Sequence, residues 1–264
     1  MKRRGWMMSF FLGILMTGVT AAHGQDESDP VRVLFLSKSS GFEHGVIKRE
    51  NNQLSPVEKI MLEWADKYNM EVVTTKDAGM ISAPVLENYD VLMLYTTGDL
   101  TQRGTDGYAP MPESGKQDLM DWLKTGGGIV GSHTSTDTFH NWEEYNKVIG
   151  GQFATHGAQQ EAVLMVEKHP ITEGLPEEWT LYDEWYFFKN LTNTFQPIMW
   201  LKSADMNEDV YQQVEKYPFA WVEKVGEGRV YQNAQGHRLD IWQNEHYEKM
   251  MINGIRWAAG RIGN

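Results

Sequence analysis

The pattern of apolar and polar positions predicts strand–helix–strand units in the first half of the chain. Four short apolar runs rich in β-branched residues stand between polar and amphipathic stretches: residues 31–37, 71–75, 91–96 and 129–133. Continuous apolar runs of this length are typical of strands buried on both faces of a parallel sheet. The sequence therefore predicts right-handed crossovers and a doubly wound, mostly parallel sheet.

Two helices are predicted between these strands. One begins at Ser55-Pro56-Val57-Glu58 and continues through Trp64, with serine as N-cap, proline in the first turn and glutamate at the capping-box position. The other runs from about Glu113 to Lys124 and ends at the glycines 126–128. Because these glycines lack the spacing of a phosphate-binding loop, we expect no nucleotide cofactor.

The second half of the chain shows a different pattern, without a long helix until its end. Five stretches are strand-like: residues 162–167, 182–188, 198–201, 219–225 and 229–234. They predict antiparallel pairs, with Gly226-Glu227-Gly228 as a hairpin turn. The stretch from Trp242 to Ala259 is amphipathic and predicts a closing helix. The expected fold is α/β, with additional antiparallel strands in this half.

Residues 1–24 are predicted to be a signal peptide. Lys2, Arg3 and Arg4 precede an apolar stretch that ends at Ala22-His23-Gly24, and acidic residues follow. Cleavage after Gly24 would leave residues 25–264 as one domain, periplasmic or secreted and without stable membrane association. An uncleaved N-terminal anchor is the alternative.

The charge of the expected mature chain narrows the choice of partners. Removing residues 1–24 takes away three cations and leaves 21 Lys+Arg against 36 Asp+Glu, a net charge of −15. Such an acidic surface argues against nucleic acid and anionic membranes as partners. Cys is absent, which excludes disulfides, a thiolate nucleophile and Cys-ligated zinc. Any metal would therefore need His, Asp or Glu ligands.

Several motifs along the chain resemble the ThuA-like (trehalose utilisation) family. They are residues 126–139 (GGGIVGSHTSTDTF) with Trp142, Gly150 to His156, Asp183 to Tyr186, Pro218 to Trp221, Gly228 to Tyr231, Gly236-His237 and Gly254 to Gly260. The resemblance implies a sandwich similar to class I glutamine amidotransferases and flavodoxins, and a part in sugar catabolism that includes keto-sugar routes. In amidotransferases a nucleophilic Cys follows a central strand, but Ser132, His133 and Thr134 lie there in this chain. Cys-dependent amidotransferase chemistry is therefore excluded.

Histidines in the predicted loops are the main candidates for chemistry. His133 follows a predicted strand at the edge where doubly wound sheets bind ligands, and we predict catalytic roles for His133 and Asp137. The alternative is that His133 only holds its loop, with Asp137 as its partner or as a helix N-cap. His133, His156 and His237 are the candidate ligands of a divalent metal (Zn, Mn, Ni or Fe), although independent histidines remain the alternative because no short metal-binding motif is present.

Glu184 is the candidate general acid or base. The resemblance places it in the motif Asp183 to Tyr186, and burial among aromatic rings is expected to raise its pKa. Strand alternation would direct Asp183 to the other face. A structural salt bridge between Glu184 and Arg256 is the alternative. The predicted substrate-binding residues are aromatic rings suited to stacking on a sugar, together with one histidine: Trp142, Trp185, Tyr186, Trp221 and His44.

Two functions follow from these candidates. The first is an exported enzyme that acts on a sugar or 3-keto-sugar glycoside by elimination, hydration or isomerisation, since a ketone acidifies the neighbouring C–H bond. The second is a sugar-binding protein without turnover. A serine hydrolase is disfavoured because Gly131 to Ser135 lacks the final glycine of a nucleophile elbow. A subunit of a complex is permitted by the charge but has no specific support.

Overall fold

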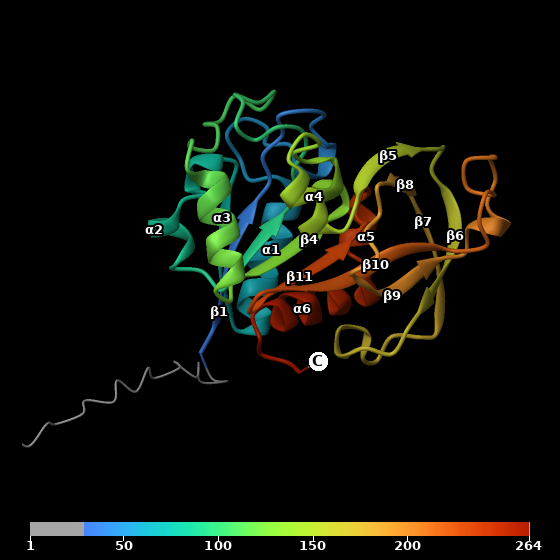
Figure 1. Ribbon diagram of the computed structural model, residues 1–264. Helices are drawn as coiled ribbons and strands as arrows, with labels where there is room; N and C mark the ends of the chain where they lie inside the picture. The colour runs from blue at the N-terminus through green and yellow to red at the C-terminus, as the bar shows by residue number, and fades with distance from the viewer. Residues whose placement is uncertain (1–28, 264) are drawn as a thin grey trace, which may run out of the picture.

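A large mixed sheet forms the centre of the molecule. The computed structural model describes residues 29–263, so the predicted signal peptide and its cleavage site lie outside the described residues. Nine strands pair in the order β2-β1-β3-β4-β11-β10-β9-β6-β7 (Figure 1). Within the described residues, no helix is long and apolar enough to cross a membrane.

The sheet has a parallel half and an antiparallel half. The parallel half contains β2 (Met70–Thr75), β1 (Val31–Leu36), β3 (Val91–Leu94), β4 (Gly128–Ser132) and β11 (Gly228–Asn233). The antiparallel half contains β10 (Tyr217–Val225), β9 (Gln196–Leu201), β6 (Gln160–Val166) and β7 (Glu178–Asp183). A separate two-stranded sheet pairs β5 (Gln152–His156) with β8 (Tyr186–Lys189).

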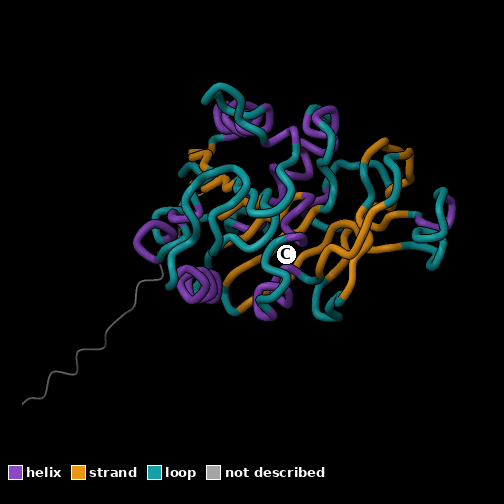
Figure 2. Tube along the Cα trace, turned by 90° about the horizontal axis from the view of Figure 1, so that it is seen from above, coloured by secondary structure: helices purple, strands orange, loops and turns teal. Residues whose placement is uncertain are grey.

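Helices cover both faces of the parallel half. The first face carries α1 (Pro56–Tyr68), α5 (Leu239–Trp242) and α6 (Glu245–Ala258), and the second carries α2 (Ala83–Leu86), α3 (Gly115–Lys124) and α4 (Glu143–Ile149). Alternate residues of β1 serve the two cores, with Val33 and Phe35 in the first and Leu34 and Leu36 in the second. Figure 2 shows the helices gathered around one half of the sheet, whereas the other half consists mainly of strands and loops. The predicted α/β class is confirmed.

Local sequence signals fix the start of α1 as predicted. The Ser55 hydroxyl accepts a hydrogen bond from the Glu58 amide at 3.2 Å, and the Glu58 carboxylate accepts one from the Ser55 amide at 2.8 Å. This reciprocal pair satisfies two amides that the first helical turn leaves without partners.

The single strand predicted over residues 182–188 is wrong. β7 ends at Asp183 and β8 begins at Tyr186 in the other sheet, so Glu184 and Trp185 lie in the connection. The break is held by tertiary hydrogen bonds, because the Trp185 indole donates to the Gln160 carbonyl at 2.7 Å and the Trp185 carbonyl accepts from the Tyr211 hydroxyl at 2.7 Å.

The start of the closing helix is also corrected. Trp242 ends the short helix α5 instead of beginning the long one. α6 begins after Asn244, whose side chain accepts from the amides of His246 and Tyr247. The amphipathic pattern continues across this junction, so the pattern alone did not reveal it. Three further elements, α2, α4 and β5, were not predicted.

Candidate metal centre

Four segments bring their polar side chains to one edge of the large sheet. His44, His133 and His237 follow β1, β4 and β11, which are parallel and therefore end at the same edge. Four antiparallel pairings separate β11 from β7, so β7 again runs in the direction of β11. Glu184, just after β7, is thereby delivered to the same edge, where parallel sheets of this type bind ligands.

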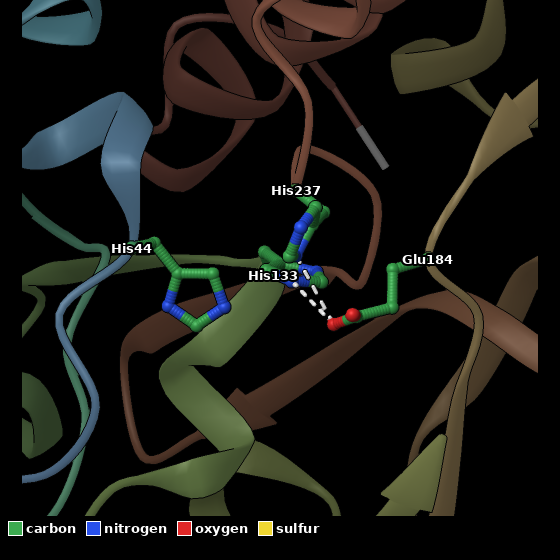
Figure 3. Close-up of side chains that lie close together, drawn as sticks. All are labelled: His44, His133, Glu184 and His237. Carbon is green, nitrogen blue, oxygen red and sulfur yellow. Dashed lines mark ion pairs between the residues drawn. The ribbon is translucent and has the colours of Figure 1, made fainter. Parts of the chain in front are cut away.

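The four side chains form a compact group, which we call the histidine cluster: His44, His133, Glu184 and His237 (Figure 3). One potential ligand atom from each lies within 4.8 Å of all the others. The three imidazole ring centres are 5.1 to 5.3 Å apart. One carboxylate oxygen of Glu184 lies 3.1 Å from His237 Nδ1 and 3.6 Å from His133 Nε2.

Hydrogen bonding assigns the tautomer of His133. Its Nδ1 lies 2.9 Å from the carbonyl oxygen of Ala234. Because a carbonyl only accepts, Nδ1 must carry the hydrogen, and in the neutral ring Nε2 keeps its lone pair. Nε2 is buried and has no hydrogen-bond partner. Histidines that ligate metals typically donate their other N–H to a backbone carbonyl in this way.

The backbone at His133 is held in an unusual conformation. Its φ of 42° lies in the left-handed region that non-glycine residues rarely adopt. The following turn is anchored at Ser135, whose hydroxyl donates to Gln232 and whose carbonyl accepts from the Tyr145 hydroxyl at 2.9 Å. Such conformations persist where surrounding contacts enforce them, and they concentrate at functional sites.

The electrostatics of the cluster favour a neutral His44 beside an ionised Glu184. Burial, reinforced by the neighbouring His133 and His237, lowers the pKa of His44 to about 2. Burial opposes ionisation of Glu184, but the favourable interactions of its carboxylate with the nearby His133 and His237 outweigh burial and hold the pKa of Glu184 well below its usual range. The expectation of a raised Glu184 pKa is therefore wrong, since the imidazoles outweigh the aromatic surroundings.

The donor set fits a divalent transition metal. Nε2 of His133 is buried and makes no hydrogen bond, a situation that costs free energy unless a cation or proton satisfies it, and Nδ1 of His237 lies 3.1 Å from the Glu184 carboxylate. Imidazole and carboxylate donors in this number suit Zn, Mn, Ni or Fe. A buried His/Glu group that could hold a metal is therefore present, with His44 in the place predicted for His156.

A second layer of residues fixes the position of His237. The amide of the preceding Gly236 donates to the buried Asp183 carboxylate at 2.9 Å. The Gly236 carbonyl accepts from the Tyr95 hydroxyl at 3.1 Å and from the Trp242 indole at 2.9 Å. With φ at 114°, this position requires glycine. Sequence reasoning missed Asp183, because strand alternation does not apply beyond the end of β7.

His156 and Tyr186 border the cluster. His156 Nδ1 lies 3.4 Å from the second Glu184 oxygen and 2.9 Å from the Gly157 carbonyl, and its side chain is 43% exposed. The Tyr186 ring packs on His133 with 4.3 Å between ring centres. Burial, with the nearby charge of Glu184, raises the pKa of Tyr186, so its hydroxyl stays protonated.

Two of the predicted stacking residues have no face available for a sugar. Trp185 and Trp221 are fully buried in the core, and their indoles donate to the carbonyls of Gln160 and Ile149. Trp142 is half-buried and packs against Phe139 and Tyr145. Aromatic residues of the core and of a binding site look alike in sequence, which explains this outcome.

The alternative structural partners of Asp137 and Glu184, His133 and Arg256, are not the ones that the structure shows. Asp137 pairs with His140, with 3.1 Å between Oδ1 and Nε2, and not with His133. Arg256 donates to the Tyr68 carbonyl, so the alternative salt bridge to Glu184 is not formed.

Comparisons with known proteins agree with the fold. A family model described as trehalose utilisation, ThuA, matches residues 32–258. No curated protein matches the chain. A ThuA-like protein from Parabacteroides merdae has a TM-score of 0.68 at 18% identity, covering 89% of this chain and 92% of that chain. A ThuA-like protein from Bacteroides uniformis has a TM-score of 0.68 at 17% identity, covering 91% and 95%. A cytoplasmic protein from Salmonella typhimurium LT2 has a TM-score of 0.61 at 15% identity, covering 86% and 99%.

Proposed function

Since this chain belongs to the ThuA family, whose description indicates a carbohydrate-related function, we propose that it is a metal-dependent enzyme acting on a sugar or 3-keto-sugar glycoside. The observation that carries the proposal is the histidine cluster, where three imidazoles and one carboxylate each place a potential ligand atom within 4.8 Å of the others. Strongly shifted titratable groups at the ligand-binding edge of a sheet are typical of catalytic sites.

His44, His133, Glu184 and His237 would hold the metal. When bound, a divalent ion at this site supplies Lewis acidity that polarises a sugar carbonyl. Because the pKa of Glu184 is held low, this residue acts in the proposal as an anionic ligand and not as the proton carrier.

His156 is the proposed base. Its Nδ1–H points to the Gly157 carbonyl, so Nε2 keeps the lone pair in the neutral ring, and the half-exposed side chain is accessible to a substrate. Nε2 would take the proton from the carbon between the ketone and the anomeric carbon. That electron pair forms a double bond to the anomeric carbon as the bond to the leaving oxygen breaks. The same imidazole then returns its proton to the leaving oxygen.

Metal analysis combined with turnover of a 3-keto-glucoside tests this function. The wild-type chain should carry one equivalent of metal and release the aglycone, and His133→Ala and His237→Ala should lose both. His246→Ala is the matched control, because His246 lies on α6 outside the cluster. Folded wild-type protein that takes up none of Zn, Mn, Ni or Fe would refute the metal centre. Metal uptake without turnover of keto-glycosides would refute the enzyme and leave a sugar-binding protein.

Export is part of the proposal. It is supported by the basic and apolar composition of residues 1–24. Expression in a Gram-negative host followed by N-terminal sequencing of the periplasmic fraction should give a chain that begins at Gln25. Recovery of the intact N-terminus from the cytoplasm would contradict export.

A further inference from the structure

The long connection between β9 and β10 reaches back to the border of the histidine cluster. It comprises residues 202–216, and the Ser203 hydroxyl closes its base by donating to the Val214 carbonyl at 2.8 Å. In Figure 1 it projects beside the turn between β5 and β6. Because β5 ends at His156, this connection lies next to the proposed base.

Tyr211 in this connection joins two segments of the site through a single atom. Its hydroxyl accepts from the Gly157 amide at 2.6 Å and donates to the Trp185 carbonyl at 2.7 Å. Gly157 directly follows His156, and Trp185 directly follows Glu184. The Tyr211 side chain is only 1% exposed, so bulk water has no access to replace these two hydrogen bonds.

The imidazole of His156 continues the same chain of hydrogen bonds. Its Nδ1 donates to the Gly157 carbonyl at 2.9 Å and lies 3.4 Å from Glu184 Oε1. A series of polar groups therefore runs from the imidazole through the Gly157 peptide groups to the Tyr211 hydroxyl and on to Trp185. The base and the carboxylate of the cluster are thereby tied to one common point.

The strand that carries His156 needs such an external anchor. β5 pairs only with β8, and a sheet of two strands is marginally stable by itself. Residues 154–156 are exposed, and the His156 side chain is 43% exposed, so little core packing fixes the ring. A general base has to lie within hydrogen-bonding distance of the proton that it removes, which a loosely held strand does not ensure.

Two neighbours of Tyr211 hold the residues that follow His156. Oε1 of Glu208 accepts from the Ala158 amide at 2.8 Å, and the Asn207 amide donates to the side-chain carbonyl of Gln160 at 2.8 Å. Glu208 has a φ of 78°, in the left-handed region that non-glycine residues rarely adopt. Such conformations persist where surrounding contacts enforce them, and they concentrate at functional sites.

We propose that Tyr211 is a positioning residue for the reaction, which holds the imidazole of His156 at a fixed place relative to Glu184 and hence to the metal. Tyr211 does not touch the substrate in this proposal and acts through His156. The inference rests on the proposed function and adds to it a residue from outside the histidine cluster.

Steady-state kinetics of Tyr211→Phe with a 3-keto-glucoside test the inference. The phenyl ring keeps its place in the core, but the Gly157 amide and the Trp185 carbonyl lose their common partner. We expect kcat to fall by about 100-fold, the usual cost of misplacing a catalytic group by about 1 Å. KM and metal content should stay at the wild-type values, because the Tyr211 hydroxyl bonds to none of the four cluster side chains.

A double-mutant cycle separates positioning from stability. In the His156→Ala background, Tyr211→Phe should lower kcat by no more than about twofold, since no base is left to misplace. Glu208→Ala is the second variant, because this exposed side chain also holds the loop after His156 and its removal does not endanger the core. Its effect on kcat should be smaller than that of Tyr211→Phe and should likewise vanish in the His156→Ala background.

Tyr217→Phe is the matched control. The Tyr217 hydroxyl is also buried, accepts from the Phe188 amide at 2.9 Å and donates to the Phe188 carbonyl at 2.6 Å. Because both bonds go to one residue, this hydroxyl joins no two segments of the site. Tyr217→Phe should therefore lower stability as Tyr211→Phe does and leave kcat unchanged.

Equal losses of kcat in the wild-type and His156→Ala backgrounds, full turnover by Tyr211→Phe, or loss of metal in that variant would each overturn the inference and leave the proposed function intact. A wild-type chain that turns over no 3-keto-glycoside would refute the proposed function. Hydrogen exchange then decides the inference separately. The Gly157 and Ala158 amides should exchange faster in Tyr211→Phe than in wild type, and unchanged exchange would overturn the role of Tyr211.

Discussion

The parallel and antiparallel halves of the sheet contribute different chemistry to the cluster. The parallel half supplies three imidazoles, each in a loop that follows one of its strands. The antiparallel half supplies one carboxylate, Glu184, after β7. In a parallel set every strand ends at the same edge, whereas antiparallel strands reach that edge only alternately. The parallel half thus offers several neighbouring ligand positions, and the antiparallel half supplies the charge that they lack.

His156 belongs to neither half, since it ends β5 of the small sheet. Replacing it therefore distinguishes the residues that bind the metal from the residue that moves the proton. We expect His156→Ala to lower turnover of a 3-keto-glycoside by about 10²–10⁴-fold, the usual worth of a general base. Metal content should stay at one equivalent, because His156 is outside the group of four. Steady-state kinetics with metal analysis on the same preparation measure both. Loss of metal in this variant would make His156 a ligand and assign the base elsewhere.

Glu184→Gln tests the charge supplied by the antiparallel half. The amide keeps the shape of the side chain but leaves the metal with neutral ligands only. We expect metal affinity to fall by about 100-fold or more, because a buried cation would lose its only anionic partner in the cluster. Competition with a chelator of known affinity measures the change. An affinity within tenfold of wild type would mean that the imidazoles of the parallel half suffice.

The division into a parallel and an antiparallel half also explains which features could be predicted from the sequence and which could not. In the parallel half, apolar runs and the Ser55 capping box are local signals, and they located the strands, α1 and the position of His133. In the antiparallel half, the aromatic pattern continues across residues 182–188, and nothing local marks the break that the Trp185 and Tyr211 hydrogen bonds impose. Burial of Trp221 likewise depends on distant parts of the chain.

Asp183 connects the two halves of the sheet, since it links the end of β7 to the loop after β11. Burial raises the pKa of this carboxyl, and its Oδ2 accepts from the Gly236 amide, which positions His237. We expect Asp183→Asn to weaken metal binding by about tenfold, as residues behind metal ligands usually do. The visible spectrum of the cobalt-substituted protein should shift, which a loss of stability alone would not cause. An unchanged spectrum would make Asp183 structural.

The capping box of α1 lies within the parallel half but outside the histidine cluster, so a substitution there should change stability without changing metal binding. Ser55→Ala removes the acceptor of the Glu58 amide and should lower the free energy of unfolding by about 1 kcal/mol. Metal affinity should not change. Urea denaturation of the metal-free chain measures the difference. A change in metal affinity would show that the α1 capping box and the histidine cluster are energetically coupled.

Glu58 makes the contribution of the α1 capping box to the free energy of unfolding pH-dependent. Burial opposes its ionisation, but the hydrogen bonds from Arg49 and from the Ser55 amide outweigh burial and lower the pKa of Glu58. A carboxyl whose pKa is lower in the folded chain than in the unfolded chain stabilises the fold above its unfolded pKa, and this contribution disappears as the pH falls through the folded pKa. Glu58→Gln should therefore destabilise the chain most at neutral pH and progressively less in acid. Urea midpoints measured for both proteins from neutral to acidic pH should converge; a constant difference would mean that Glu58 acts through packing and not through its charge.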